Sequence, residues 1–257
     1  MTTKPKPTLF IVHGGWHVPE SYKKLTRALE SQGYEVHLPR LPSVNGARPP
    51  NADLSTDTLL IRSYVESLVR TGRIVVVIMH SYGGLVGSNA LHGLGLEARA
   101  KQSLAGGVSK LIYLTAYLVP EGVSAMDKNR EFGSEHLVPV VMDIADDNTC
   151  LWRDPKGLMI GPWPDEAEVE ENANTFVRWN MNALNHRPEN AAWREIPFTY
   201  TFTTLDMTLP LSYQQSMVEL VQKSGYEPRI YELETGHCPH LTATERVVEI
   251  VNEVING

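Results

Sequence analysis

The stretch Ile74-Val75-Val76-Val77-Ile78-Met79-His80-Ser81-Tyr82-Gly83-Gly84 decides the fold of this chain. Its run of five Val and Ile residues is typical of a buried strand in a parallel sheet. A serine follows, then two glycines, then residues 85–91, which we expect to be helical. A strand, a sharp turn with serine and a helix present a hydroxyl where backbone N–H groups can hold an oxyanion. The alternative is an ordinary strand-to-helix turn with a serine cap.

Length and charge narrow the class of protein. The chain has 257 residues and a net charge of −7, which suits one large α/β domain with an insertion. Because there is no basic run, nucleic acid and anionic membranes are poor partners. No window approaches the ~20 apolar residues of a membrane span, and no signal peptide is recognisable. With two cysteines and no disulfide framework, we expect a cytoplasmic protein.

Strand-like and helix-like segments alternate along the chain, which predicts a parallel sheet with helices on both faces. The predicted strands are 8–13, 34–38, 74–80, 109–115, 197–203 and 229–233. The predicted helices are 21–32, 54–69, 85–91, 210–224 and 243–255. In such sheets the active site lies at the carboxyl ends of the strands.

The alternation breaks in a segment rich in Trp and Met. We interpret residues 118–194 as a cap inserted over the site, and residues 1–117 and 195–257 as the core domain. Large aromatic and thioether side chains need burial, and a lid facing an apolar substrate supplies it. The alternative is a set of long surface loops whose side chains simply pack onto the core.

Three side chains at predicted strand ends could form a Ser-His-Asp triad. The hydroxyl of Ser81 needs a neighbouring base, and His237, after the last strand, is favoured over His240. Asp206 follows the fifth strand, in the chain order Ser…Asp…His, and would fix the histidine tautomer. The alternative acid is Glu121, and the structural alternative for Asp206 is a carboxylate at a helix N-terminus.

An oxyanion hole needs two backbone N–H donors. One is expected from Tyr82, directly after the serine. The other is expected from the loop after the first strand, where two glycines let the backbone approach a substrate closely. Gly15 is the preferred donor in this loop, and a plain glycine turn is the alternative.

Histidines and tryptophans surround these segments. His13, His17 and His80 fit no standard zinc spacing, and no phosphate-binding loop occurs, so we expect neither metal nor cofactor. His13 and His80 are interpreted as buried hydrogen-bonding residues near the site. The expected substrate-binding side chains are His13, Trp16, Trp152, Trp163 and Trp179.

With these residues, the chain resembles the α/β-hydrolase superfamily, and within it the plant methylesterases and hydroxynitrile lyases with their microbial relatives. The matching segments are 12–16, 80–84, 192–197 leading to residue 206, and 236–237. The resemblance covers essentially the whole chain, most weakly in the cap. It implies a triad and two oxyanion donors, namely Ser81, Asp206 and His237 with Gly15 and Tyr82. The fold usually begins with a β-hairpin for which this chain has no room, so six strands are expected.

Departures from the family pattern narrow the chemistry. Met79 stands where the serine motif has its first glycine. The cyanohydrin-cleaving relatives carry lysine directly after the catalytic histidine, where this chain has Cys238, so cyanohydrin lysis is not expected. Ser81 argues against haloalkane dehalogenases and epoxide hydrolases, because both need a carboxylate nucleophile.

The prediction is therefore a cofactor-independent, carboxylesterase-like serine hydrolase. It would cleave an ester, lactone or thioester of an apolar small molecule through an acyl-enzyme. The first alternative is a lyase, cyclase or isomerase that uses the same pocket with histidine acid–base chemistry. The second is a non-catalytic small-ligand binder. The oligomeric state stays open, with a homodimer among the options, and fold alone decides none of this.

Overall fold

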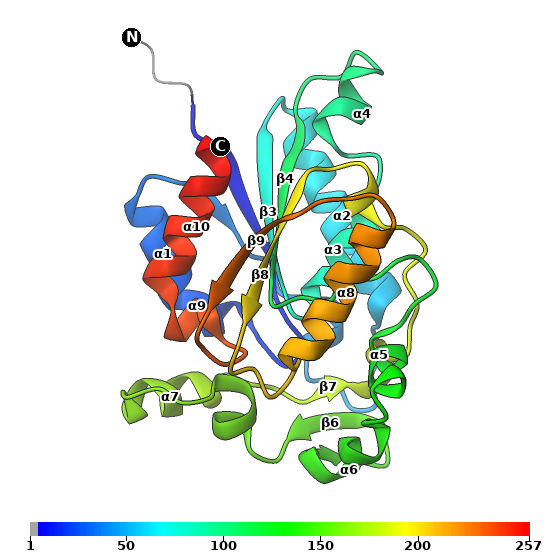
Figure 1. The fold of residues 1–257 in the computed structure, drawn as a ribbon, viewed down its shortest axis with the longest axis vertical. Coiled ribbons are helices and arrows are strands. Elements are labelled where there is room, and N and C mark those ends of the chain that lie inside the picture. The colour runs from blue at the N-terminus through cyan, green and yellow to red at the C-terminus, as the bar shows by residue number, and fades with distance from the viewer. Residues whose placement is uncertain (1–4) are drawn as a thin grey trace.

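A six-stranded parallel sheet forms the centre of the computed structural model, which describes residues 5–257 (Figure 1). The strand order is β2-β1-β3-β4-β8-β9, and every neighbouring pair runs parallel. The strands are β1 (Thr8–Val12), β2 (Val36–His37), β3 (Ile74–His80), β4 (Gly107–Leu114), β8 (Phe198–Thr203) and β9 (Arg229–Leu233). The six-stranded sheet predicted from the sequence is thus confirmed.

Helices cover both faces of the sheet (Figure 1). Leu9 and Ile11 of β1 belong to the apolar cluster of α1 and α10, whereas Phe10 and Val12 belong to that of α2, α3 and α8. These helices are α1 (Lys23–Ser31), α2 (Leu54–Arg70), α3 (Gly83–Ala90), α8 (Leu211–Lys223) and α10 (Thr244–Asn256). Two short helices, α4 (Leu96–Ala100) and α9 (Pro239–Thr242), complete this part of the chain. Because both faces are covered at the centre of the sheet, the inner strands β1, β3 and β4 are mostly apolar, whereas the edge strand β9 is largely exposed.

Local sequence explains where the helices begin and end. The carboxylate of Asp53 caps α2 by accepting hydrogen bonds from the backbone N–H groups of Ser55 and Thr56. Gly33 and Gly72, which follow α1 and α2, have φ angles of 81° and 83°. Glycine adopts this left-handed conformation without strain, so it stops each helix. Among residues 5–257, no helix combines the length and apolarity needed to cross a membrane.

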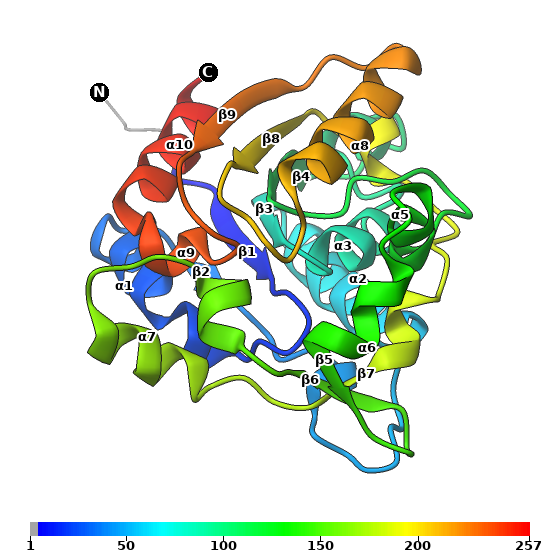
Figure 2. The same cartoon turned by 60° about the horizontal axis from the view of Figure 1, so that its bottom comes forward.

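Between β4 and β8 the chain leaves the sheet and forms a layer at its carboxyl edge, toward which the arrows of β8 and β9 point (Figures 1 and 2). This inserted layer holds a second, antiparallel sheet of order β5-β6-β7. Its large side chains Trp152, Trp179, Met142 and Met159 are buried in the cluster that also covers one sheet face. Its elements are α5 (Ala125–Glu131), α6 (Val138–Val141), β5 (Met142–Ile144), β6 (Thr149–Trp152), α7 (Glu166–Ala173) and β7 (Trp179–Asn180).

The topology marks one place on the carboxyl edge. Strand β1 lies between β2 and β3, so successive connections leave in opposite directions there. Ligands of open α/β sheets bind at such a switch point. The loop 13–17 after β1 and the turn after β3 meet at this position.

Candidate active site

Ser81 follows β3 directly and has a left-handed backbone conformation, with φ of 55°. Two glycines make the turn possible. A Cβ atom on Gly83 would overlap the carbonyl oxygen of Val12, and one on Gly84 would overlap that of Tyr117. Glycine alone lets α3 approach these backbone segments so closely. The surrounding packing thus maintains a strained residue at the head of the helix.

Met79 occupies the position where comparable turns carry glycine, and α3 makes room for it. A Cβ atom on Gly87, one turn further along the helix, would overlap the Met79 sulfur. The missing side chain at Gly87 therefore compensates for the added one at Met79.

The three residues predicted as a triad lie in one chain of hydrogen bonds. Nε2 of His237 is 2.8 Å from the Ser81 hydroxyl oxygen. Nδ1 of the same ring is 2.7 Å from a carboxylate oxygen of Asp206. All three side chains are buried, and Ser81 is 4% exposed. A base in contact with the hydroxyl and a carboxylate behind the base is the arrangement that activates a serine.

Asp206 is held rigidly in the loop after β8. Its Oδ2 atom also accepts hydrogen bonds from the hydroxyls of Thr115, at 2.7 Å, and Thr203, at 2.9 Å. Its Oδ1 atom accepts from the backbone N–H groups of Thr208 and Leu209, both at 2.8 Å. These bonds satisfy a buried carboxylate and aim it at the imidazole.

The alternative base and acid lie elsewhere. His240 belongs to α9, and its ring stacks on Tyr22 with a centroid distance of 4.1 Å. Neither nitrogen of this buried ring has a hydrogen-bond partner among residues 5–257. Glu121 pairs at the surface with Arg194, 2.9 Å away. Neither His240 nor Glu121 is hydrogen-bonded to the imidazole of His237.

His80 ties the His237 loop to the loop after β1. The backbone N–H of Gly14 donates to the Tyr22 hydroxyl, which lies 2.6 Å from Nδ1 of His80. Nε2 of His80 lies 2.7 Å from the carbonyl oxygen of His237 and donates to it. Burial lowers the pKa of His80 well below its usual value, so the ring is neutral and carries its proton on Nε2.

Two further histidines shape the loop after β1. Nδ1 of His13 donates to the carbonyl oxygen of Gly14, and Nδ1 of His17 donates to that of Gly15, both at 2.8 Å. Nε2 of His13 accepts the backbone N–H of Leu41. Burial lowers the pKa of His13 to about 4, so this ring is neutral as well.

One group of side chains has the composition of a metal site. The donor atoms of His17, Cys238 and His240 lie within 4.8 Å of one another. A metal would need the thiolate, but burial raises the pKa of the Cys238 thiol well above its usual value. The thiol sulfur lies 3.5 Å from Nε2 of His17. A hydrogen bond between a neutral thiol and a neutral imidazole accounts for this contact.

Two backbone N–H groups in the segments around the serine are unpaired within the part of the chain that the structure describes. A Cβ atom on Gly14 would lie 3.0 Å from Cβ of Ser81, so the loop after β1 packs directly against the nucleophile position. Trp16, the next residue but one, has a left-handed φ of 63°. Among residues 5–257, the N–H groups of Gly15 and Tyr82 have no hydrogen-bond partner. Free donors of this kind are suited to an oxyanion.

A cavity of about 130 Å³ opens onto Ser81 and His237. Its lining is mostly apolar and comes from the loop after β1, the inserted layer and the start of α8. Of the five side chains expected to bind substrate, Trp16 and Trp152 line this cavity. The other three do not.

Each of those three has a different environment. His13 forms hydrogen bonds with the backbone of Gly14 and Leu41 and so supports the loop after β1. The indole N–H of Trp163 donates to Glu168 of α7, away from the cavity. Trp179 is fully buried behind Gly15.

Sequence reasoning missed several residues around the site. Tyr117 lines the cavity, and Thr115 holds Asp206. Both lie within three residues after the end of β4, so their position at a strand's carboxyl end could have identified them. Tyr213 of α8 also lines the cavity, but no sequence signal separates it from other helix residues.

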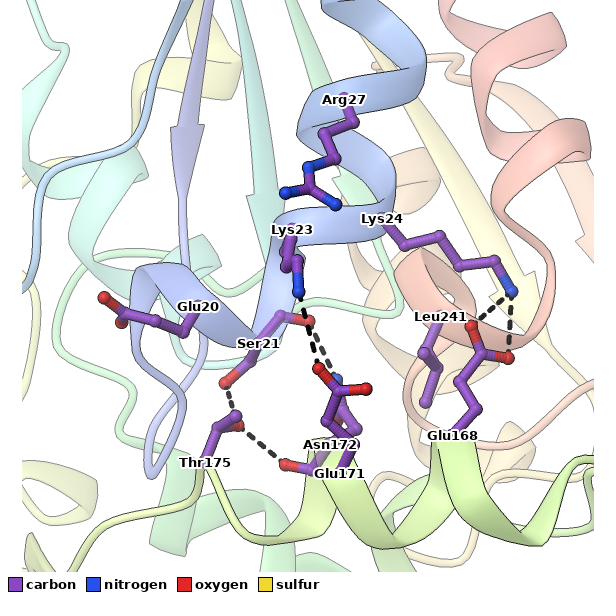
Figure 3. A pocket seen from close by; sticks show the side chains of 10 residues that line it. All are labelled: Glu20, Ser21, Lys23, Lys24, Arg27, Glu168, Glu171, Asn172, Thr175 and Leu241. Carbon is purple, nitrogen blue, oxygen red and sulfur yellow. Dashed lines mark hydrogen bonds and ion pairs between the residues drawn. The ribbon is translucent and has the colours of Figure 1, made fainter.

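A larger cavity of about 330 Å³ lies between α1 and α7 and has a different character (Figure 3). Lys24 pairs with Glu168 at 2.8 Å, and Lys23 pairs with Glu171 at 3.4 Å. The amide of Asn172 donates to the carbonyl oxygen of Ser21. Opposite charges already pair across this space, and none of the triad candidates lines it. We interpret this cavity as part of the interface between the inserted layer and α1.

Comparisons with known proteins identify the family of this chain. The sequence profile of the "Alpha/beta hydrolase family" matches residues 9–250. The chain is 26% identical to "Probable hydrolase R7" of a Phoma species, covering 97% of this chain and 98% of that protein. It is 29% identical to "Alpha/beta hydrolase nvfD" of Aspergillus novofumigatus, covering 96% and 95%.

Solved structures share the fold. A pyrethroid hydrolase from Sphingobium faniae superposes with a TM-score of 0.73 at 22% identity, covering 98% of both chains. Tomato methylketone synthase I superposes with a TM-score of 0.77 at 14% identity, covering 98% of this chain and 99% of the other. With a family match over almost its full length, this chain is a member of the alpha/beta hydrolase family.

Proposed function

We propose that this hydrolase cleaves a carboxylic ester, lactone or thioester of a small apolar molecule through an acyl-enzyme on Ser81. The observation that carries the proposal is the continuous hydrogen-bonded series Asp206, His237 and Ser81. This series ends at a strained serine that lines a mostly apolar cavity. Strain and burial at one hydroxyl are typical of a working nucleophile.

In the proposed reaction, Nε2 of His237 takes the proton of Ser81 as Oγ attacks the substrate carbonyl carbon. The resulting oxyanion accepts hydrogen bonds from the N–H groups of Gly15 and Tyr82. The imidazolium, stabilised by Asp206, then protonates the leaving oxygen or sulfur. Water attacks the acyl-enzyme by the same sequence of proton transfers and releases the acid.

The cavity limits the size of the group next to the reacting carbonyl. An engineered apolar cavity of about 150 Å³ holds one benzene molecule, and the cavity at Ser81 is about 130 Å³. We therefore propose a buried acyl or alcohol part of about six carbons. Residues 118–194 would act as the cap that lines one side of this cavity, over a core of residues 1–117 and 195–257.

The test combines a covalent probe with a panel of esters. A fluorophosphonate should add once to the wild type, as measured by intact mass, and not to Ser81→Ala. Turnover of p-nitrophenyl esters should peak at acyl chains of about four to six carbons, and Ser81→Ala should lose at least ~10³-fold in kcat. Ser63→Ala, which changes an exposed serine of α2, is the control and should match the wild type.

Two outcomes would overturn the proposal. One is an unlabelled wild-type protein without ester turnover. The other is ester turnover that survives in Ser81→Ala. Labelling only at another residue would place the nucleophile elsewhere and contradict the proposed triad.

A further inference from the structure

The residue after the nucleophile position is anchored by a buried carboxylate. The hydroxyl of Tyr82 donates to Oδ2 of Asp57 at 2.9 Å. Tyr82 is 1% exposed and Asp57 is fully buried. Asp57 lies in the first turn of α2, 24 residues before Ser81 in the sequence. Burying a carboxylate is costly unless it is well bonded, so its partners indicate what it holds in place.

The same carboxylate also binds the proline-rich loop before α2. The backbone N–H of Ser43 donates to Oδ1 of Asp57 at 2.8 Å, and the Ser43 hydroxyl donates to Oδ2 at 2.5 Å. The Ser43 oxygen in turn accepts the indole N–H of Trp179 at 2.9 Å. Trp179 belongs to β7 of the inserted layer, so one carboxylate links the core to that layer.

The indole ring of Trp179 contacts both segments that carry the free N–H groups. A Cβ atom on Gly15 would lie 2.6 Å from the indole ring, so the ring packs flush against this glycine. The ring also contacts Tyr82, with centroids 4.6 Å apart and planes at 64°. A shift of Trp179 or of the Tyr82 side chain would therefore move Gly15 or the backbone at Tyr82.

We propose that Asp57 is a positioning residue that sets the two backbone donors of the oxyanion hole, acting through Tyr82 on one and through Ser43 and Trp179 on the other. This inference rests on the proposed function. Donors help catalysis only when they are fixed before the oxyanion forms. A misplacement of about 1 Å can reduce a rate by about 10²-fold.

The ionisation of Asp57 is consistent with this role. Burial raises its pKa to about 6, and the hydrogen bonds from Ser43 and Tyr82 oppose that rise. At pH 8 the group is therefore an anion, which accepts all three hydrogen bonds in their strong, charge-assisted form.

The test compares Asp57→Asn and Tyr82→Phe at pH 8 with p-nitrophenyl butyrate. Both variants remove the bond between Tyr82 and the carboxylate while keeping side-chain shape. We expect kcat to fall 10- to 100-fold with KM within about twofold of wild type. Asp53→Asn is the control, since it removes a half-buried carboxylate at the N-cap of the same helix and keeps a capping side chain. It should retain wild-type rates.

Two further measurements separate positioning from a merely structural role. A trifluoromethyl ketone, whose hemiketal oxyanion would occupy the hole, should bind 10- to 100-fold more weakly to both variants. The melting temperature of Asp57→Asn should stay at or above the wild-type value, because the variant no longer buries a charge. The double variant should lose no more activity than the worse single variant, since both act through one contact.

The outcomes distinguish this inference from the proposed function. If the wild type is labelled by fluorophosphonate and both variants keep wild-type kcat and inhibitor affinity, the role of Asp57 is refuted and the hydrolase mechanism stands. If the wild type is neither labelled nor active, both proposals fail together. Should Asp57→Asn not fold, Tyr82→Phe decides, since its ring still packs on Trp179.

Discussion

Asp206 accepts five hydrogen bonds, from two threonine hydroxyls, two backbone N–H groups and His237. An asparagine at this position can keep the backbone bonds through its carbonyl oxygen. Its NH₂ group, however, cannot accept a hydrogen bond from the Nδ1–H group of His237, so the imidazole would take the wrong tautomer.

We therefore expect Asp206→Asn to lower kcat by roughly 10³- to 10⁴-fold while the protein remains folded. Steady-state hydrolysis of a p-nitrophenyl ester, with circular dichroism as the folding control, measures both effects. Glu121→Gln changes the alternative acid, which pairs with Arg194 at the surface, and should leave kcat within about twofold. The reverse pattern, with activity lost in Glu121→Gln and kept in Asp206→Asn, would assign the acid to Glu121.

The candidate site divides into residues that sequence could and could not place. Ser81, Asp206 and His237 each lie within four residues after the end of a strand, and parallel strands bring their carboxyl ends to one edge. The structure does bring these three together. Asp57 and Trp179 carry no such signal. In sequence, Asp57 is one more acidic residue in a first helical turn, and its contacts come from tertiary packing alone.

Among the elements, strand β3 and helix α3 show how a departure from a sequence motif is accommodated. Gly87 faces Met79, and an added Cβ would overlap the Met79 sulfur. Alanine normally favours a helix over glycine by about 1 kcal/mol. In this helix, overpacking should reverse the sign.

We expect Gly87→Ala to lower the free energy of unfolding by ~1–3 kcal/mol in the wild-type background. In a Met79→Ala background the same change should be neutral or stabilising, because the clashing sulfur is absent. Urea denaturation of the four proteins in this cycle gives the coupling energy. An equal effect of Gly87→Ala in both backgrounds would show that Met79 and Gly87 do not compensate for each other.

The sheet and the position of the insertion were predictable from sequence, whereas the strands and helices inside the inserted layer were not. The inner strands β1, β3 and β4 are largely buried on both faces, so they form visible apolar runs between helical patterns. Strands β5 to β7 have two to four residues, too few for any period to show. Helix α4, with five residues, was missed for the same reason. These short elements depend on contacts with the rest of the fold rather than on local pattern.

At the scale of the whole molecule, neutral buried histidines dominate the response to acid. Burial lowers the pKa of His13 to about 4 and of His240 to about 3. Burial also lowers the pKa values of His17 and His80 well below the usual 6.5. The unfolded chain binds these protons below about pH 6.5, while the folded protein does not. Above that pH the histidines are neutral in both states and cost the fold nothing. As the pH falls below about 6.5, they lower the free energy of unfolding.

Asp57 has the opposite effect. Its pKa is raised from 3.8 to about 6 on folding, so at pH 5 the folded protein holds a proton that the unfolded chain releases. Unfolding at pH 5 therefore binds about four protons on the histidines and releases one from Asp57. The net uptake is about three protons, so acid should destabilise the fold despite Asp57.

We expect the free energy of unfolding to fall by ~4 kcal/mol per pH unit between pH 6 and pH 5, from a net uptake of about three protons. Urea titrations across this range measure the slope directly. His240→Phe keeps an aromatic ring on Tyr22 and removes two unpartnered nitrogens. The proton uptake on unfolding, calculated from the slope, should therefore decrease by about one proton. His136→Gln, which changes an exposed histidine, should leave it unchanged. A slope near zero in the wild type would mean that these imidazoles are protonated in the folded protein, which the low-dielectric packing around Tyr22 opposes.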